Sequence, residues 1–125
     1  MTTGPTPQQR EQIQTLEILR QRIQHVYGLV ERLAAEKGEN DMQSSAIRRA
    51  LAQLKLQFSG QGYAALAQTT GAMELAARRG SQRQIKAKQL REGIGTLRTQ
   101  LDTEHRVLLA EVRRNVGEPV EKKEE

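Results

Sequence analysis

The stretch that decides the fold is residues 81–114, SQRQIKAKQLREGIGTLRTQLDTEHRVLLAEVRR. Its apolar side chains recur at intervals of three and four residues, and only a helix places such a series on one face. Ser81 has the position of an N-cap and Gly117 and Pro119 stop signals, so one helix is predicted from Ser81 to about Asn115. The predicted packing seam of this helix is Leu90, Ile94, Leu97, Leu101, His105, Leu108 and Val112.

The seam also repeats every 11 residues, as Leu90, Leu101 and Val112 illustrate. An 11-residue period keeps a seam nearly straight or slightly right-handed, whereas a strict heptad imposes a left-handed supercoil. The helix is therefore expected to form a straight wall of a bundle in preference to a leucine zipper. A coiled-coil pairing of this helix between two chains, giving a homodimer, is compatible with the same pattern.

A line of arginines runs beside the seam, about 100° around the helix axis. Such a line predicts contact with an acidic protein or with nucleic-acid phosphates. It is also compatible with a solvated face on which Asp102 pairs with Arg106 one turn later. The candidate partner or nucleic-acid contacts are Arg78, Arg79, Arg83, Lys88, Arg91, Arg98, Arg106 and Arg113.

The N-terminal part of the chain predicts a second long helix, over about 7–36. Thr6, Pro7 and Gln9 have the order of a capping box, and Gly38 is placed to end the helix. The apolar face of this helix is wider than one neighbour covers, so contacts with two helices are expected. The face consists of Ile13, Leu16, Leu19, Ile23, Val26, Tyr27, Val30 and Leu33, with Ile18 and Leu29 beside it.

Two shorter helices are predicted between the long ones. The first follows a cap at Asn40 or Asp41 and reaches the Ser-Gly-Gln-Gly cluster at 59–62, and the second spans about 63–79. If 59–62 is a tight reversal, the chain is an all-α antiparallel bundle of four helices in the order long, short, short, long. If it is only a kink, the short helices join and the bundle has three helices.

One domain is expected, because 125 residues are too few for two comfortable cores. It spans 7–115, between a flexible N-terminus at 1–6 and a charged, disordered tail at 116–125. The chain has only three aromatic residues and no Trp, so aliphatic side chains must build the core. Ligand pockets usually contain several aromatic groups, and no small-molecule substrate or cofactor is predicted.

The net charge of +5 is unevenly distributed. Residues 1–45 contain five Lys or Arg and six Asp or Glu, residues 46–114 contain thirteen and five, and residues 115–125 contain two and four. The basic excess therefore belongs to the middle and C-terminal helices. Such a field attracts nucleic acid, an acidic protein or a membrane surface, and charge alone does not choose among them.

Several other classes are excluded or disfavoured by composition. The absence of Cys excludes disulfides, thiolate zinc sites and cysteine nucleophiles. No apolar run approaches the ~20 residues of a membrane helix, and residues 1–9 lack the charged-then-apolar order of a signal peptide. A cytoplasmic protein without a membrane span is expected.

No catalytic or metal-binding constellation is predicted. Asp102 and His105 form one copy of a motif that metal sites in bundles need on two helices, so His105 is interpreted as a seam residue. His25 has Gly28 nearby but lacks the lysine expected near a phosphotransfer histidine. The serines, Ser44, Ser45, Ser59 and Ser81, lie at predicted caps or loops without a base at a diagnostic spacing.

These patterns predict a non-enzymatic helical-bundle interaction module that binds another protein, itself, or both. An adaptor, a scaffold and a small subunit of a complex all fit this description. The alternative is a nucleic-acid-associated accessory subunit that binds the phosphate backbone through the basic face of residues 78–114. The shortage of aromatic residues disfavours a reader of stacked single-stranded bases.

Overall fold

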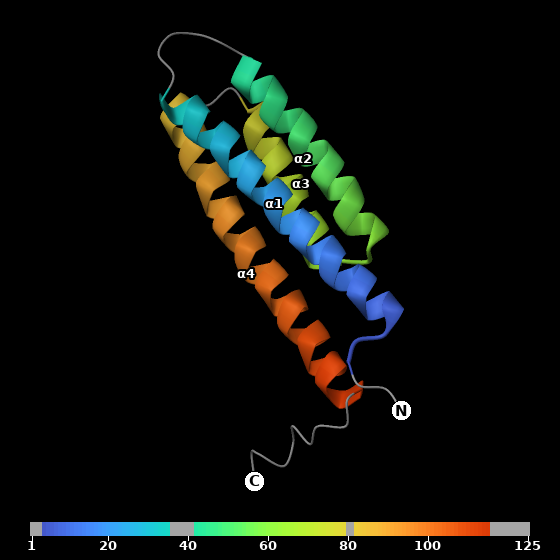
Figure 1. Ribbon diagram of the computed structural model, residues 1–125. Helices are drawn as coiled ribbons and strands as arrows, with labels where there is room; N and C mark the ends of the chain where they lie inside the picture. Colours follow the sequence, from blue (N-terminus) through green and yellow to red (C-terminus); the bar gives the residue numbers. More distant parts are fainter. Residues whose placement is uncertain (1–3, 36–41, 80–81, 116–125) are drawn as a thin grey trace.

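The computed structural model describes residues 4–35, 42–79 and 82–115, and within these ranges it contains four helices and no strand (Figure 1). The helices are α1 (Pro7–Ala35), α2 (Met42–Gly60), α3 (Ala64–Arg78) and α4 (Arg83–Asn115). They have 29, 19, 15 and 33 residues, which confirms the predicted order of long, short, short and long. The alternative with three helices is not formed.

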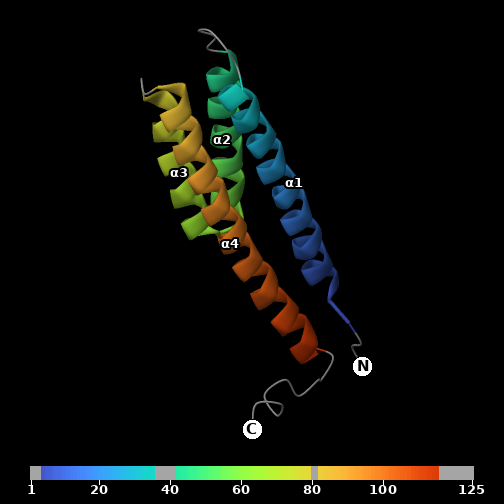
Figure 2. The same ribbon diagram turned by 90° about the vertical axis from the view of Figure 1, so that its left-hand side faces the viewer.

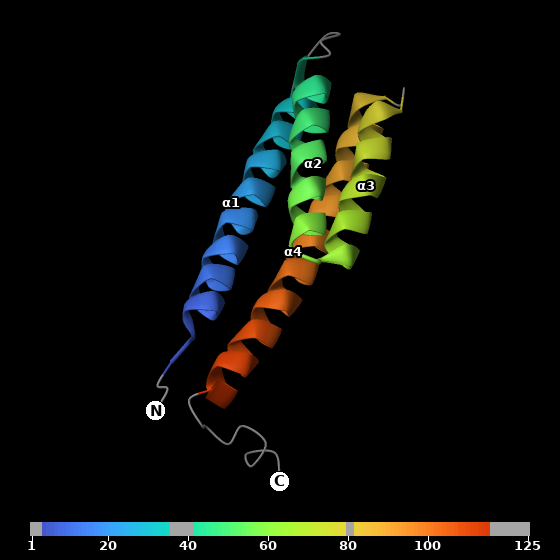
Figure 3. The same cartoon turned by 90° about the vertical axis from the view of Figure 1, so that its right-hand side faces the viewer.

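The four helices form a closed ring in which each packs against two others. α2 packs on α1 and α3, and α4 closes the ring by packing on α3 and α1 (Figures 2 and 3). In the described ranges, the backbones of the diagonal pairs α1–α3 and α2–α4 do not approach each other closely. The prediction that the wide apolar face of α1 contacts two helices is therefore confirmed.

The first turn of α1 is held by the predicted capping box. The Thr6 amide donates to Gln9 Oε1 at 3.0 Å, and the Gln9 amide donates to Thr6 Oγ1 at 3.1 Å. These two bonds satisfy donors that a helix start leaves without an intrahelical acceptor. The other predicted caps and stops, at Gly38, Asn40, Asp41, Ser81, Gly117 and Pro119, lie outside the described residues, as does the tail 116–125.

The cluster at 59–62 is a tight reversal because α2 ends in a Schellman motif. The Tyr63 amide donates to Phe58 O at 2.9 Å and the Gly62 amide donates to Ser59 O at 3.1 Å, the two bonds that define this motif. Gly62 has φ of 81°, a left-handed conformation that glycine adopts without the strain of a Cβ atom. α3 then starts at Ala64 and returns along α2.

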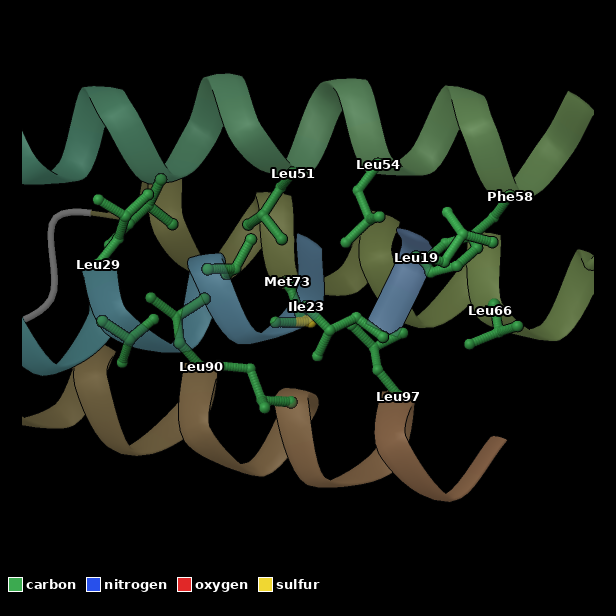
Figure 4. Close-up of a cluster of buried hydrophobic side chains, with 14 of the residues drawn as sticks. Leu19, Ile23, Leu29, Leu51, Leu54, Phe58, Leu66, Met73, Leu90 and Leu97 are labelled. Atoms are coloured by element: carbon green, nitrogen blue, oxygen red, sulfur yellow. The ribbon is translucent and has the colours of Figure 1, made fainter. Parts of the chain in front are cut away.

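An aliphatic core runs along the axis of the ring. Side chains from all four helices meet in it, as Figure 4 shows for Leu19, Leu54, Leu66 and Leu97. Phe58, at the last turn of α2, is also fully buried. Burial of each such side chain contributes about 1.5–3 kcal/mol. Of the predicted α4 seam, Leu90, Ile94, Leu97, Leu101 and Leu108 are buried, whereas His105 and Val112 are partly exposed.

The long helices extend past the short ones at one end of the ring (Figures 1 and 3). The α2–α3 turn lies beside Thr15 of α1, because Gly60 and Thr15 line the same groove. On its α4 side, burial raises the pKa of the Tyr63 phenol, and the nearby carboxylate of Glu104 raises it further. We call residues 7–14 and 105–114 the projecting end. Leu108 is its only buried residue.

Candidate interaction surfaces

The first arginine of the predicted stripe is occupied by a partner on α1. Arg91 donates from Nε to Glu31 Oε2 at 2.7 Å and from Nη2 to Glu31 Oε1 at 3.0 Å. This two-pronged geometry matches the guanidinium fork to the carboxylate. The hydrogen bond from Arg91 lowers the pKa of Glu31, and the same bond raises the pKa of Arg91.

Two further contacts continue this line between α1 and α4. Arg98 donates from Nη2 to Gln24 Oε1 at 2.8 Å, and its Cζ lies 5.0 Å from the ring centroid of Tyr27, within the range of a cation–π contact. Arg20 of α1 pairs with Asp102 of α4 at 3.1 Å. Asp102 therefore pairs across the helices, whereas the solvated-face alternative paired it with Arg106 on the same helix.

The structure consequently divides the predicted contact residues into three groups. Arg91 and Arg98 bind α1, whereas Arg106 and Arg113 are exposed in the projecting end. At the other end of the ring, Arg78 and Arg79 are exposed where α3 ends. In the first part of α4, Lys88 is exposed and Arg83 is half-buried.

The short helices α2 and α3, with their turn, form a hairpin whose solvent side is free of acid. Among the exposed residues between 42 and 79 there is no Asp or Glu. We call this exposed side the hairpin face. Leu56 is 73% exposed and Leu75 is 54% exposed on it. Its cations are Arg48, Arg49, Lys55, Arg78 and Arg79.

The single carboxylate of the hairpin lies beneath this face. Glu74 is 9% exposed, and its Oε1 lies 3.4 Å from Lys55 Nζ. The Lys55 side chain reaches it by crossing Gly71, whose absent Cβ would lie 3.8 Å from Nζ. Nothing in the sequence pattern assigned a role to Glu74.

Two glutamines have buried side-chain oxygens that accept no hydrogen bond from the described part of the chain. Gln57 Oε1 lies in the groove between α1 and α2, which Arg22 and His25 also line. Gln89 Oε1 lies in the groove between α3 and α4, beside Gly93. No sequence signal distinguishes these two positions, because glutamine is frequent along the whole chain.

The histidines do not gather with other ligating groups. His25 is exposed at the α1–α2 groove, and His105 is partly exposed in the projecting end. Across residues 4–35, 42–79 and 82–115, no three His, Cys, Asp or Glu side chains approach closely enough to hold a metal ion. None of the helices described combines the length and the apolar content needed to cross a membrane.

Comparison with known proteins adds no relative to this description. No protein-family model matches the chain, and no curated protein and no solved structure matches it significantly.

Proposed function

We propose that the chain is a non-enzymatic helical-bundle interaction module, an adaptor, scaffold or small subunit, that self-associates through its projecting end. The observation that carries this proposal is the length difference between the helices, which leaves the ends of α1 and α4 without the cover that α2 and α3 provide elsewhere. The α4 seam continues into this end with Leu108 and Val112.

A second copy supplies the missing cover with the correct helix directions. If the projecting ends of two copies overlap, with the second copy turned end for end, the overlap forms a new ring of four helices. Its order is α1 and α4 of the first copy, then α4 and α1 of the second. Every neighbouring pair in that ring is antiparallel, as in the bundle itself. The arrangement is a closed two-fold dimer in which the same surface of each copy is used.

The side chains of the projecting end favour weak association. Val107 is 51% exposed on α4, beside the seam. On α1 the positions four and eight residues before the buried Leu16 are Gln12 and Gln8, both exposed. A buried amide must be hydrogen-bonded, and each glutamine carries both a donor and an acceptor. The expected dimer therefore forms only at higher concentrations. Its interface consists partly of apolar side chains and partly of glutamine amides.

Sedimentation velocity over a wide concentration range tests this proposal. The native chain is expected to shift from one-chain to two-chain mass, and Val107→Glu is expected to remain a monomer because it places a charge in the interface. Ile85→Glu is the matched control, since Ile85 is 48% exposed near the opposite end of the same helix. A one-chain mass at all concentrations would contradict self-association.

A second candidate is a nucleic-acid-associated subunit that binds phosphates through the basic face of residues 78–114. Exposed Arg78, Arg79 and Lys88 lie near one end of the ring and support it. The contacts of Arg91 and Arg98 with α1 reduce that support, because these guanidinium groups are already hydrogen-bonded. If the chain does not bind duplex nucleic acid even at low salt, this candidate function is wrong.

A further inference from the structure

We propose that the hairpin face binds an acidic amphipathic helix of another protein. This inference rests on the proposed interaction function, and it uses a surface distinct from the projecting end. Several arginines of this face pair with no carboxylate among the residues that the structure describes. Arg48 donates to the Ser45 hydroxyl, and no described carboxylate pairs with Arg48, Arg49, Arg78 or Arg79.

The four arginines occupy one end of the hairpin. Arg48 and Arg49 lie in the first part of α2, and Arg78 and Arg79 lie where α3 ends, so the antiparallel hairpin brings both pairs to the end opposite its turn. Glu74, the one acid between residues 42 and 79, is buried beneath Lys55 and does not offset them at the surface. Charge complementarity therefore requires an acidic partner, with its carboxylates grouped at one end.

The apolar part of the hairpin face selects the class of partner. Leu56 and Leu75 are more exposed than buried, although each lies on a helix whose other leucines are buried. A phosphate backbone has no apolar surface with which to cover them, whereas an amphipathic helix presents apolar side chains and carboxylates together. The observations favour a protein helix over nucleic acid for this reason.

The dimensions of the hairpin set the length of that helix. Its two helices have 19 and 15 residues, which corresponds to about 22–28 Å at 1.5 Å per residue. A partner helix of about 17 residues would span it. Such a helix would pack along the solvent side of α2 and α3, with its acidic end over the four arginines.

A labelled peptide of about 17 residues provides the probe. It carries leucines at every third or fourth position along one face and four glutamates in its first two turns. Fluorescence anisotropy with the full chain is expected to give saturable binding. A scrambled peptide of the same composition and a peptide with lysine in place of glutamate are expected to bind at least tenfold more weakly.

Charge position is tested with two variants that lose equal charge. Replacement of Arg48, Arg49, Arg78 and Arg79 by Gln is expected to weaken peptide binding at least tenfold. The control replaces four exposed arginines of the projecting end by Gln and is expected to change affinity less than threefold. These control residues are Arg10, Arg106, Arg113 and Arg114. Equal weakening by both variants would overturn the proposal, because net charge would then explain the binding.

The apolar contribution is tested separately with two double variants. Leu56→Gln with Leu75→Gln is expected to weaken peptide binding at least fivefold, whereas Ile18→Gln with Ile85→Gln changes exposed apolar residues elsewhere and should have little effect. If the leucine variant binds the peptide normally, the proposal fails.

The anisotropy assay also compares the acidic peptide with two competing partners. Together with sedimentation velocity, it separates this inference from the proposed self-association. Tighter binding of duplex RNA or of anionic lipid vesicles than of the acidic peptide would overturn the proposal in favour of that partner. A chain that stays monomeric but binds the peptide through the hairpin face refutes self-association at the projecting end and supports this inference. A chain that dimerises but does not bind the peptide gives the opposite result.

Discussion

The α1–α4 pair and the α2–α3 hairpin use charged residues in different ways. Between α1 and α4, arginines meet carboxylates and an amide of the facing helix, as in Arg91–Glu31 and Arg20–Asp102. The hairpin buries its single acid and leaves its arginines at the surface. A basic excess in the sequence therefore does not locate a binding surface until the intramolecular partners of each cation are known.

The largest expected effect is a difference in the free energy of unfolding between two parts of α4, the part that the short helices cover and the projecting end. Leu97 and Leu108 are 11 residues apart on α4, but only Leu97 lies where all four helices meet. Leu97→Ala is expected to lower the free energy of unfolding by about 2–5 kcal/mol, and Leu108→Ala by at most about 2 kcal/mol.

Urea unfolding followed by far-ultraviolet circular dichroism measures both values at low protein concentration. Equal losses for Leu97→Ala and Leu108→Ala would mean that a further segment or a second copy already covers the projecting end. The same pair repeated at high concentration reports on self-association, because a dimer raises the cost of Leu108→Ala.

The second effect concerns the contact between the hairpin and α4. A Cβ at Gly93 would lie 2.5 Å from Met73 Cγ and 2.7 Å from its Sδ, closer than atoms pack. Gly93→Ala is expected to destabilise the bundle by up to about 2 kcal/mol, because overpacking exceeds the gain in helix propensity. Gly95→Ala has open space and is expected to stabilise by up to about 1 kcal/mol. Equal thermal midpoints would contradict this packing.

The third, smaller effect concerns the ion pair between Lys55 and the buried Glu74. Lys55→Met leaves the Glu74 carboxylate nearly buried without its cation, and we expect a loss of about 1 kcal/mol, since Lys55 itself is half exposed. Adding Glu74→Gln removes the unpaired charge and should recover most of the loss. A double-mutant cycle with no coupling between the two sites would show that Glu74 does not depend on Lys55.

The smallest effect is the pH dependence of the Arg91–Glu31 pair. The pKa of Glu31 is lowered in the folded chain, so its contribution is present above its unfolded pKa and is lost as the pH falls through the folded value. Glu31→Gln is expected to have a slightly lower thermal midpoint than the native chain at neutral pH. The two midpoints should converge below pH 4.5, the ordinary pKa of this carboxyl. A difference that persists in strong acid would point to a cause other than the ion pair.

The fold was predictable because its determinants are local. Apolar spacing fixed the helices, and the glycines of 59–62 allowed a reversal, although only the Schellman bonds at Gly62 distinguish a reversal from a kink. The uses of the arginines were less predictable. Arg91 and Glu31 are 60 residues apart, so their contact depends on the rotation of two helices about their axes. The apolar spacing determines this rotation only approximately.

The hairpin face illustrates the same limit. The absence of acid from Met42 to Gly60 is visible in the sequence, and so is the single acid of α3. The burial of Glu74 beneath Lys55 depends on which side of α3 faces α2, and small residues on both sides of α3 leave that choice open in the sequence.

The Schellman motif at Gly62 has a consequence for the order of folding. It joins α2 to α3 through contacts between residues close in sequence, and such contacts form early because they require little loop closure. The Arg20–Asp102 contact spans 82 residues and requires most of the chain to be in place. The hairpin is therefore expected to form first, and closure of the ring by α1 against α4 is expected to limit the folding rate. Substitutions at Gly62 would then slow folding, because the hairpin is already formed when the ring closes. Loss of Asp102 would mainly accelerate unfolding if its contact with Arg20 forms only after the helices have closed.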